Sequence, residues 1–127
     1  MYRPALITGV ICAALAVILG AFGAHKLKEI LEPANVATFE TGVTYQFYHS
    51  FALLAAGMLH RSYSFRQIRI ATLLFVFGIA LFSGSLYLLV YMKAIGASLG
   101  PIGILTPIGG LCFIVGWILL LLGILRK

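Results

Sequence analysis

The sequence predicts an all-α membrane protein whose four transmembrane helices form an up-down bundle. Of its 127 residues, 62% are hydrophobic and only 9% are charged, whereas an average soluble protein is about 45–50% apolar and about 25% charged. Four apolar runs also recur along the chain, each close to the ~20 residues that a helix needs to cross a bilayer. No linker or polar tail separates them, so residues 1–127 read as a single integral membrane domain. The predicted spans are approximately 4–24, 36–60, 67–92 and 107–125.

The first span follows Arg3 and carries no charge. A secretory signal peptide is the competing interpretation, because Arg3 gives a positive start and residues 21–23 resemble a small-residue cleavage site. The run is long for a signal-peptide core, however, and small residues recur along it at 4-3-4-3 spacing, at Gly9, Ala13, Ala16, Gly20 and Gly23. Such a stripe allows close approach of a neighbouring helix. We therefore favour a retained membrane span.

Between the first two spans, residues 25–32 change in character. Apolar side chains fall on one side of the predicted helix and charged side chains on the other. This pattern is typical of a short interfacial helix that rests its apolar face on lipid and turns its charges to water. We expect Pro33 to end this helix and Asn35 to cap the next one.

The second span, residues 36–60, holds most of the polar side chains of the chain. Small and polar residues follow one stripe at 3-4-3-4 spacing, at Gly42, Tyr45, His49, Ala52 and Ala56. Gln46 lies beside this stripe. Because polar groups within a bilayer almost always face the bundle interior, we expect the stripe to face the other helices.

The third span is expected to start at a capping box formed by Ser64 and Gln67. Small residues recur along it, with a seven-residue repeat at Ala71, Gly78 and Ser85 and further room for close packing at Ser83 and Gly84. The fourth span is expected to start at Thr106 as a capping hydroxyl, with Pro107 at the first helical position. Glycines again recur every seven residues along it, at Gly109, Gly116 and Gly123.

Charge orients the predicted bundle. Four spans place both termini and the turn after the second span on one side, which holds six basic residues, namely Arg3, Arg61, Arg66, Arg69, Arg126 and Lys127. The other side holds three lysines and all three acids of the chain. Because the side richer in basic residues stays in the cytoplasm, we expect both termini there. The net charge of +6 sits at the ends of apolar runs, which indicates contact with lipid head groups rather than nucleic acid.

Four segments in the same order carry a resemblance to a known family. They are residues 20–25 (GAFGAH), 39–49 (FETGVTYQFYH), 81–87 (LFSGSLY) and 106–110 (TPIGG). Together they resemble the YgdD/YwdK family of small bacterial inner-membrane proteins, and the resemblance covers essentially the whole chain. It implies a four-span protein of the bacterial cytoplasmic (inner) membrane, related by resemblance to a small eukaryotic membrane protein family. It implies no activity and supplies no catalytic residues.

The residues that could carry chemistry form a candidate polar membrane site, which comprises Glu40, Tyr45, Gln46, His49, Ser83, Ser85 and Tyr87. His49 lies near mid-membrane and can change charge near neutral pH, so a proton relay or a polar ligand pocket is one interpretation. The other is an interhelical hydrogen bond from His49 to Ser83, Ser85 or Tyr87, of roughly 1 kcal/mol, that fixes the helix register. We favour the second interpretation.

The sequence offers no metal, haem or other cofactor site. Paired ligands on a helix usually stand three or four residues apart, whereas His49 lies nine residues, or ~13 Å at 1.5 Å per residue, beyond Glu40. His25 is expected at the membrane surface as an interfacial residue and a possible partner for Glu40. Cys12 and Cys112 are expected at different depths, so we expect two reduced side chains. The chain also lacks Asp, a G-x-S-x-G elbow and a phosphate-binding loop, so we expect no enzyme activity.

Two functional classes remain open. The first is a non-enzymatic protein that binds membrane lipid, a larger membrane complex or a second copy of itself through its small-residue stripes. The alternative is a small oligomeric channel or transporter with a polar path at Glu40, Gln46 and His49. Four helices with glycine on most faces leave little room for a pore within one protomer, which favours the first class.

Overall fold

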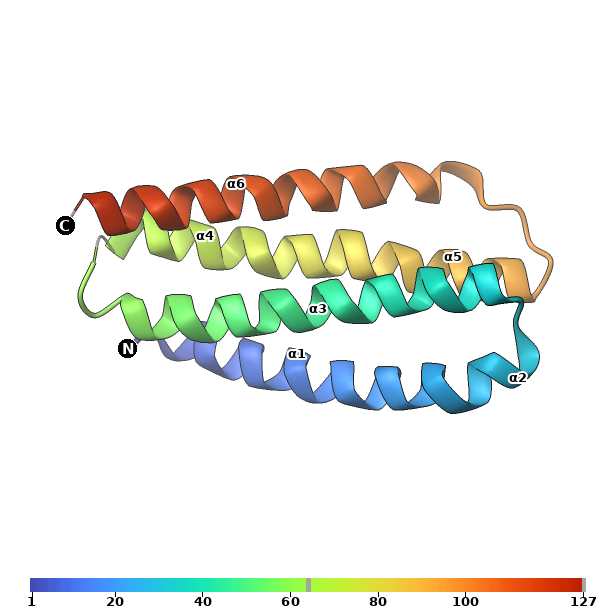
Figure 1. Ribbon diagram of the computed structural model, residues 1–127. Helices are drawn as coiled ribbons and strands as arrows, with labels where there is room; N and C mark the ends of the chain where they lie inside the picture. Colours follow the sequence, from blue (N-terminus) through green and yellow to red (C-terminus); the bar gives the residue numbers. More distant parts are fainter. Residues whose placement is uncertain (64, 127) are drawn as a thin grey trace.

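The computed structural model describes residues 1–63 and 65–126, and this part of the chain is helical with no strand (Figure 1). Its elements are α1 (Arg3–Phe22), the π-helical turn η1 (Gly23–Leu27), α2 (Lys28–Ile30), α3 (Pro33–Leu59), α4 (Phe65–Gly78), the π-helical turn η2 (Ile79–Ser83), α5 (Gly84–Ala94), the 3-10 helix η3 (Gly100–Ile104) and α6 (Leu105–Leu125). The predicted all-α class is therefore confirmed.

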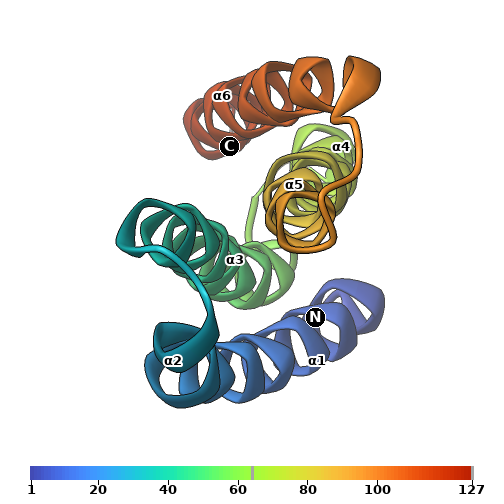
Figure 2. The same ribbon diagram turned by 90° about the vertical axis from the view of Figure 1, so that its right-hand side faces the viewer.

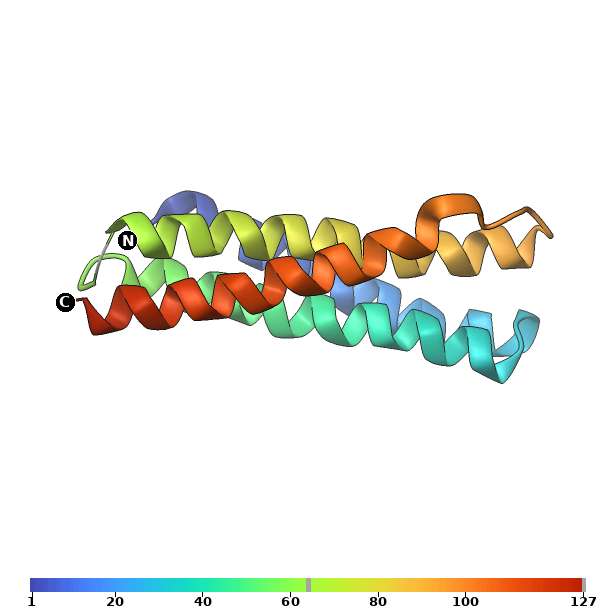
Figure 3. The ribbon, with the colours of Figure 1, turned by 90° about the horizontal axis from the view of Figure 1, so that it is seen from above.

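The described residues form four long helical rods, which we number in chain order as residues 3–30, 33–59, 65–94 and 100–125. They run back and forth along one axis, so that both termini lie at the same end (Figures 1 and 3). Viewed along that axis, they follow a zigzag in which α1 packs on α3, α3 on α4 and α5, and α6 on α4 (Figure 2). One apolar cluster, around Leu53, Ile68 and Phe75, joins α3, α4 and α6. A second, around Ala16, Phe39 and Val90, joins α1, α3 and α5. α3 is therefore the central helix.

Among the described residues, three helical runs are long and apolar enough to cross a membrane, namely Arg3–Ile30, Phe65–Ala94 and Gly100–Leu125. α3 has 27 residues, which is also a sufficient length. It does not join the three because polar side chains such as Gln46 and His49 lower its hydropathy. The same side chains are buried within the fold, as described below.

Glycines let the rods approach closely. On α1, a Cβ at Gly9 would lie 3.0 Å from the Ser50 carbonyl oxygen of α3. The seven-residue glycine repeat of α6 faces the third rod: a Cβ at Gly116 would lie 2.8 Å from the Phe75 ring, and one at Gly123 would lie 2.9 Å from Ile68. Such contacts exclude larger side chains, because packed interiors have no spare volume.

Residues 25–32 do not form a helix of their own. α1 continues through η1 into α2 as one helical run that ends at Ile30, because Gly23 and Lys28 keep right-handed helical dihedral angles. Leu31 is extended, and Pro33 opens α3 as expected for a proline at the first helical position. Asn35 therefore lies inside the first turn of α3, and the helix has no side-chain cap.

The predicted start of the fourth span is also corrected. η3 runs directly into α6, so the backbone is already helical at Ile104 and leaves no free helix end for the Thr106 hydroxyl to cap. The turn before it uses two glycines in the left-handed region, Gly96 (φ 71°) and Gly100 (φ 53°). The predicted capping box falls on Ser64, which lies outside the described residues, and Gln67.

Candidate functional site

Gln46 connects three rods at the middle of α3. Its Nε2 donates a hydrogen bond to the Cys12 carbonyl oxygen of α1 at 2.8 Å, and its Oε1 accepts one from the Tyr87 hydroxyl of α5 at 2.7 Å. Only 4% of its surface is exposed. A primary amide can donate and accept at once, which is why one side chain serves two neighbouring helices.

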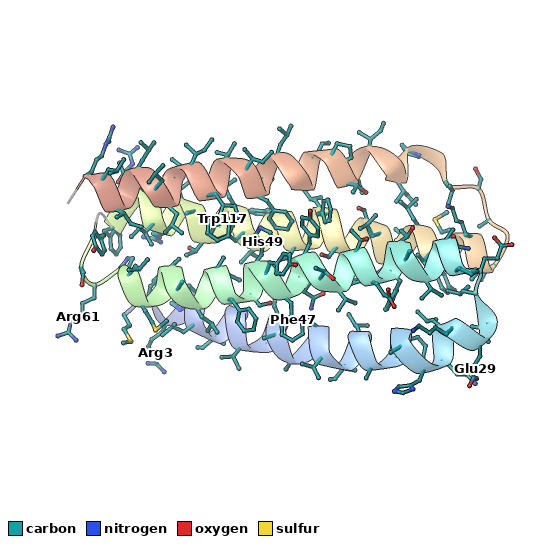
Figure 4. The ribbon with its side chains drawn as sticks, in the orientation of Figure 1. Arg3, Glu29, Phe47, His49, Arg61 and Trp117 are labelled. Carbon is teal, nitrogen blue, oxygen red and sulfur yellow. The ribbon has the colours of Figure 1, made fainter. Side chains whose placement is uncertain are left out.

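His49 lies less than one turn further along α3 and is equally buried. Its Nδ1 lies 2.8 Å from the Tyr45 carbonyl oxygen, and its Nε2 accepts a hydrogen bond from the Trp117 indole Nε1 at 3.1 Å (Figure 4). Because a carbonyl only accepts and an indole N–H only donates, these contacts select the neutral tautomer with its proton on Nδ1. The ring also stacks on Phe113, with centroids 3.5 Å apart.

Two serines of the third rod complete what we call the polar seam, which comprises Gln46, His49, Ser83, Ser85 and their partners. Ser83 Oγ donates a hydrogen bond to the Gly42 carbonyl oxygen of α3 at 2.6 Å. Ser85 Oγ lies 2.6 Å from Thr106 Oγ1 of α6 and also bonds the Phe82 carbonyl oxygen. Both serines are buried, so each hydroxyl stabilises the contact between two rods.

The partner of His49 differs from the prediction. The sequence predicts a bond to Ser83, Ser85 or Tyr87, whereas the imidazole bonds Trp117 on α6, and those three side chains bond Gly42, Thr106 and Gln46. Trp117, the one tryptophan of the chain, was not predicted as a partner. Trp117 lies near the middle of an apolar run, whereas tryptophan usually lies at the membrane surface. This unusual depth was the signal in the sequence that could have identified it.

Glu40 and His25 do not join the polar seam, and Tyr45 contributes only its backbone carbonyl oxygen to it. Glu40 is exposed near the start of α3, where it lines a surface hollow with Lys28. His25 is exposed on η1 and forms no ion pair with Glu40 in the described structure. Within residues 1–63 and 65–126, no three His, Cys, Asp or Glu side chains gather where a metal ion could bind. Cys12 and Cys112 are both free thiols.

An aromatic groove opens beside His49, between α3, η2 and α6. It has a volume of about 560 Å³ and is lined by Tyr45, Tyr48, His49, Phe82, Gly110, Phe113, Ile114 and Trp117. The Tyr45 ring packs against that of Phe82 in a tilted arrangement with centroids 4.7 Å apart, and Tyr45 is 38% exposed. His49 lines this groove while both of its ring nitrogens are engaged, by the Tyr45 carbonyl oxygen and the Trp117 indole.

The remaining histidine, His60, lies at the end that holds the termini, directly after α3. Tyr2 stacks on its ring with centroids 4.9 Å apart, and Phe65 contacts it edge-on at 4.2 Å. Its Nε2 is buried with no hydrogen-bond partner in the described part of the chain. This burial lowers the pKa of His60 below its usual 6.5, and the positive charges of the N-terminus and Arg69 act in the same direction.

A lowered histidine pKa predicts that acid destabilises this end of the molecule. Above pH 6.5 His60 is neutral in the folded and unfolded states, whereas below it the unfolded state takes up the proton first, so stability falls as the pH drops. The Tm measured in detergent should therefore fall more between pH 8 and pH 5 for the wild type than for His60→Phe, which keeps the ring stack. Equal pH dependence of the two proteins would show that His60 is not responsible.

These features define a class of protein. The described residues form three apolar rods of membrane-spanning length, each joined to α3 by a buried hydrogen bond. This is the construction of an integral membrane protein with several helices. Comparison with known proteins then gives the family. The chain belongs to the family described as "Protein of unknown function (DUF423)", whose model matches residues 19–110.

Relatives align over nearly the full length of the chain. The UPF0382 membrane protein SSP2132 of Staphylococcus saprophyticus is 43% identical over 118 residues, which cover 93% of each chain. The UPF0382 membrane protein YwdK of Bacillus subtilis is 37% identical over 122 residues, 95% of each chain. The UPF0382 inner membrane protein YgdD of Escherichia coli is 34% identical over 128 residues, 98% of this chain and 91% of its own. The resemblance to the YgdD/YwdK family is thus confirmed. No solved structure matches the chain.

Proposed function

We propose that this chain is a non-enzymatic, four-span protein of the bacterial inner membrane that acts by binding a protein partner, lipid or a second copy of itself. The observation that carries the proposal is the closed polar seam. Both polar atoms of the Gln46 amide and both ring nitrogens of His49 have a hydrogen-bond partner within the fold, and each residue is only 4% exposed. A conduction path needs groups that contact water or exchange partners, so the seam favours a role in fixing helix positions.

The proposal includes α3 as the fourth span. α3 lies antiparallel to its neighbours over their length and has 27 residues (Figure 1). Polar side chains within a bilayer usually face the bundle interior and pair there. The bonds of Gln46, His49 and Ser50 to other rods or to the backbone of α3 pair the buried polar side chains in its middle. A helix of modest hydropathy can span a membrane when its polar groups are sheltered in this way.

The orientation proposed is with both termini in the cytoplasm. Arg3 and Arg61 lie together at one end of the rods and Glu29 lies at the other (Figure 4). Basic residues gather at the first end, which is the arrangement that retains a segment in the cytoplasm. The short α2 would then lie at the outer surface, where its charged side chains meet water. The name of the E. coli relative as an inner membrane protein supports the same compartment.

Reconstitution into liposomes tests whether the seam conducts. The wild-type protein is expected to add no proton flux above that of protein-free liposomes, measured with an internal pH-sensitive dye under an imposed potential. Trp117→Phe removes the indole N–H but keeps an aromatic ring, and it should lower the free energy of unfolding by about 1 kcal/mol without opening a flux. A wild-type flux that His49→Ala abolishes would contradict the proposal and establish the channel alternative.

A further inference from the structure

One surface of α3 carries polar groups that the fold leaves without partners. We call it the α3 outer face, and it comprises Thr41, Thr44, Tyr45, Tyr48 and Phe51, which recur at helical spacing. Tyr48 is 59% exposed and Phe51 is 55% exposed. The Thr41 hydroxyl bonds the Ala37 carbonyl oxygen of its own helix. Within residues 1–63 and 65–126, in contrast, the hydroxyls of Tyr45 and Tyr48 form no hydrogen bond.

The depth of these hydroxyls makes their lack of partners costly. Tyr48 lies two residues, or ~3 Å along the axis, from the midpoint of α3 at Gln46. If α3 spans the bilayer, as the proposed function holds, the Tyr48 hydroxyl lies in the hydrocarbon and far from water. Tyrosine usually lies at the membrane surface, where its hydroxyl reaches head groups. An unpaired hydroxyl in an apolar medium is unfavourable by several kcal/mol on transfer scales, so a partner is expected to cover this face.

We propose that the α3 outer face binds a second copy of this chain in a parallel, two-fold symmetric dimer. Two copies inserted in the same orientation meet at equal depths, so each residue near the symmetry axis faces its own counterpart. A tyrosine hydroxyl both donates and accepts, and therefore pairs with an identical group, as a carboxylate or an ammonium cannot. A lipid acyl chain at this depth has no acceptor to offer.

The shape of the face is also self-complementary. Tyr48 stands between two hollows and lines both of them. One hollow, of about 430 Å³, is lined by Thr44, Phe47, Tyr48 and Phe51. The other is the aromatic groove of about 560 Å³ beside His49. A two-fold axis brings the Tyr48 ring of each copy against the groove of the other copy. One surface can therefore supply both halves of the contact.

Cysteine cross-linking in membranes tests the surface. In a background with Cys12→Ala and Cys112→Ala, Thr44→Cys should be cross-linked into dimers by a short bifunctional thiol reagent, because Thr44 lies beside Tyr48 and its replacement keeps both tyrosines. Val17→Cys is the matched control, because Val17 is 58% exposed and lies at the midpoint of the first helical run, on α1. We expect at least five times more cross-linked dimer for Thr44→Cys. Equal cross-linking at the two sites, or none at Thr44→Cys, would overturn the proposal.

A second variant tests the hydroxyl without removing the ring. Tyr48→Phe should raise the dimer dissociation constant in lipid bilayers about 3- to 10-fold, the range for one interhelical hydrogen bond in a membrane. Tyr91→Phe, at a 61% exposed tyrosine of α5, should leave it unchanged. The dissociation constant comes from single-molecule counting in liposomes of decreasing protein density. The dimer would be overturned by a wild-type protein that stays monomeric, or that purifies as a monomer with a small molecule bound in the groove. Neither result would affect the expectation that the protein conducts no protons.

Discussion

Gly109→Ala is expected to lower the free energy of unfolding by about 3 kcal/mol, the upper part of the range for overpacking a well-packed interior. Gly109 is buried where α6 crosses η2. A Cβ there would overlap the backbone nitrogen of Phe82 and lie 2.8 Å from the Leu81 carbonyl carbon. Backbone atoms cannot rotate away as a side chain can, so the two rods must separate.

The neighbouring glycine provides the control for this prediction. A Cβ at Gly110 would meet only the Phe82 ring, at 3.9 Å, which is an ordinary contact. Gly110→Ala should therefore leave stability unchanged or raise it by up to about 1 kcal/mol through helix propensity. Both variants can be measured by unfolding in mixed micelles of increasing denaturing detergent. A similar loss for the two variants would show that α6 does not approach η2 as closely as described.

The spacing of small residues could be predicted because helical geometry alone determines it. The seven-residue glycine repeat of the fourth span predicted a packed stripe, and its members face the third rod. Composition predicted a helical membrane protein for an equally general reason, since 62% hydrophobic content exceeds what a soluble domain can bury. Neither prediction requires knowing which helices are neighbours, so the sequence alone is sufficient for both.

Helix ends were less predictable, because the rules for them assume that a helix stops. The charges of residues 25–32 suggested a separate helix, but neither a proline nor a glycine with a positive φ lies between Phe22 and Pro33. The helical run that begins with α1 therefore continues through η1 and α2 to Ile30. In the same way, Thr106-Pro107 resembles a helix start, yet η3 precedes it and already supplies the first helical turns. Thr106 is left to bond Ser85 instead.

The partners within the polar seam could not be predicted, because periodicity identifies the inward face of a helix but not the helix opposite. His49 was expected to face the third span, and the zigzag of the rods brings it against Trp117 of α6. Gln46 was predicted as a member of the candidate polar membrane site, but without a partner on another helix. Its position at the centre of α3 allows its amide to reach α1 on one side and α5 on the other.

Gln46→Leu is expected to lower the free energy of unfolding by about 2 kcal/mol. Leucine has a similar size but removes the acceptor that the Tyr87 hydroxyl uses and the side-chain donor to the Cys12 carbonyl oxygen. Interhelical hydrogen bonds in membranes average about 0.6 kcal/mol each, and a stranded buried hydroxyl adds about 1 kcal/mol or more. The measurement is the same detergent unfolding, with helicity followed by circular dichroism.

A double-mutant cycle separates the stranded hydroxyl from lost packing. Tyr87→Phe removes the donor, so Gln46→Leu together with Tyr87→Phe leaves no hydroxyl stranded between α3 and α5. The double variant should then lose about 1 kcal/mol less than the sum of the two single losses, because directly bonded residues couple by this amount. Additive losses would mean that the amide acts through volume alone. A coupling of the expected size would show that the hydrogen bond between Gln46 and Tyr87 holds α3 against α5.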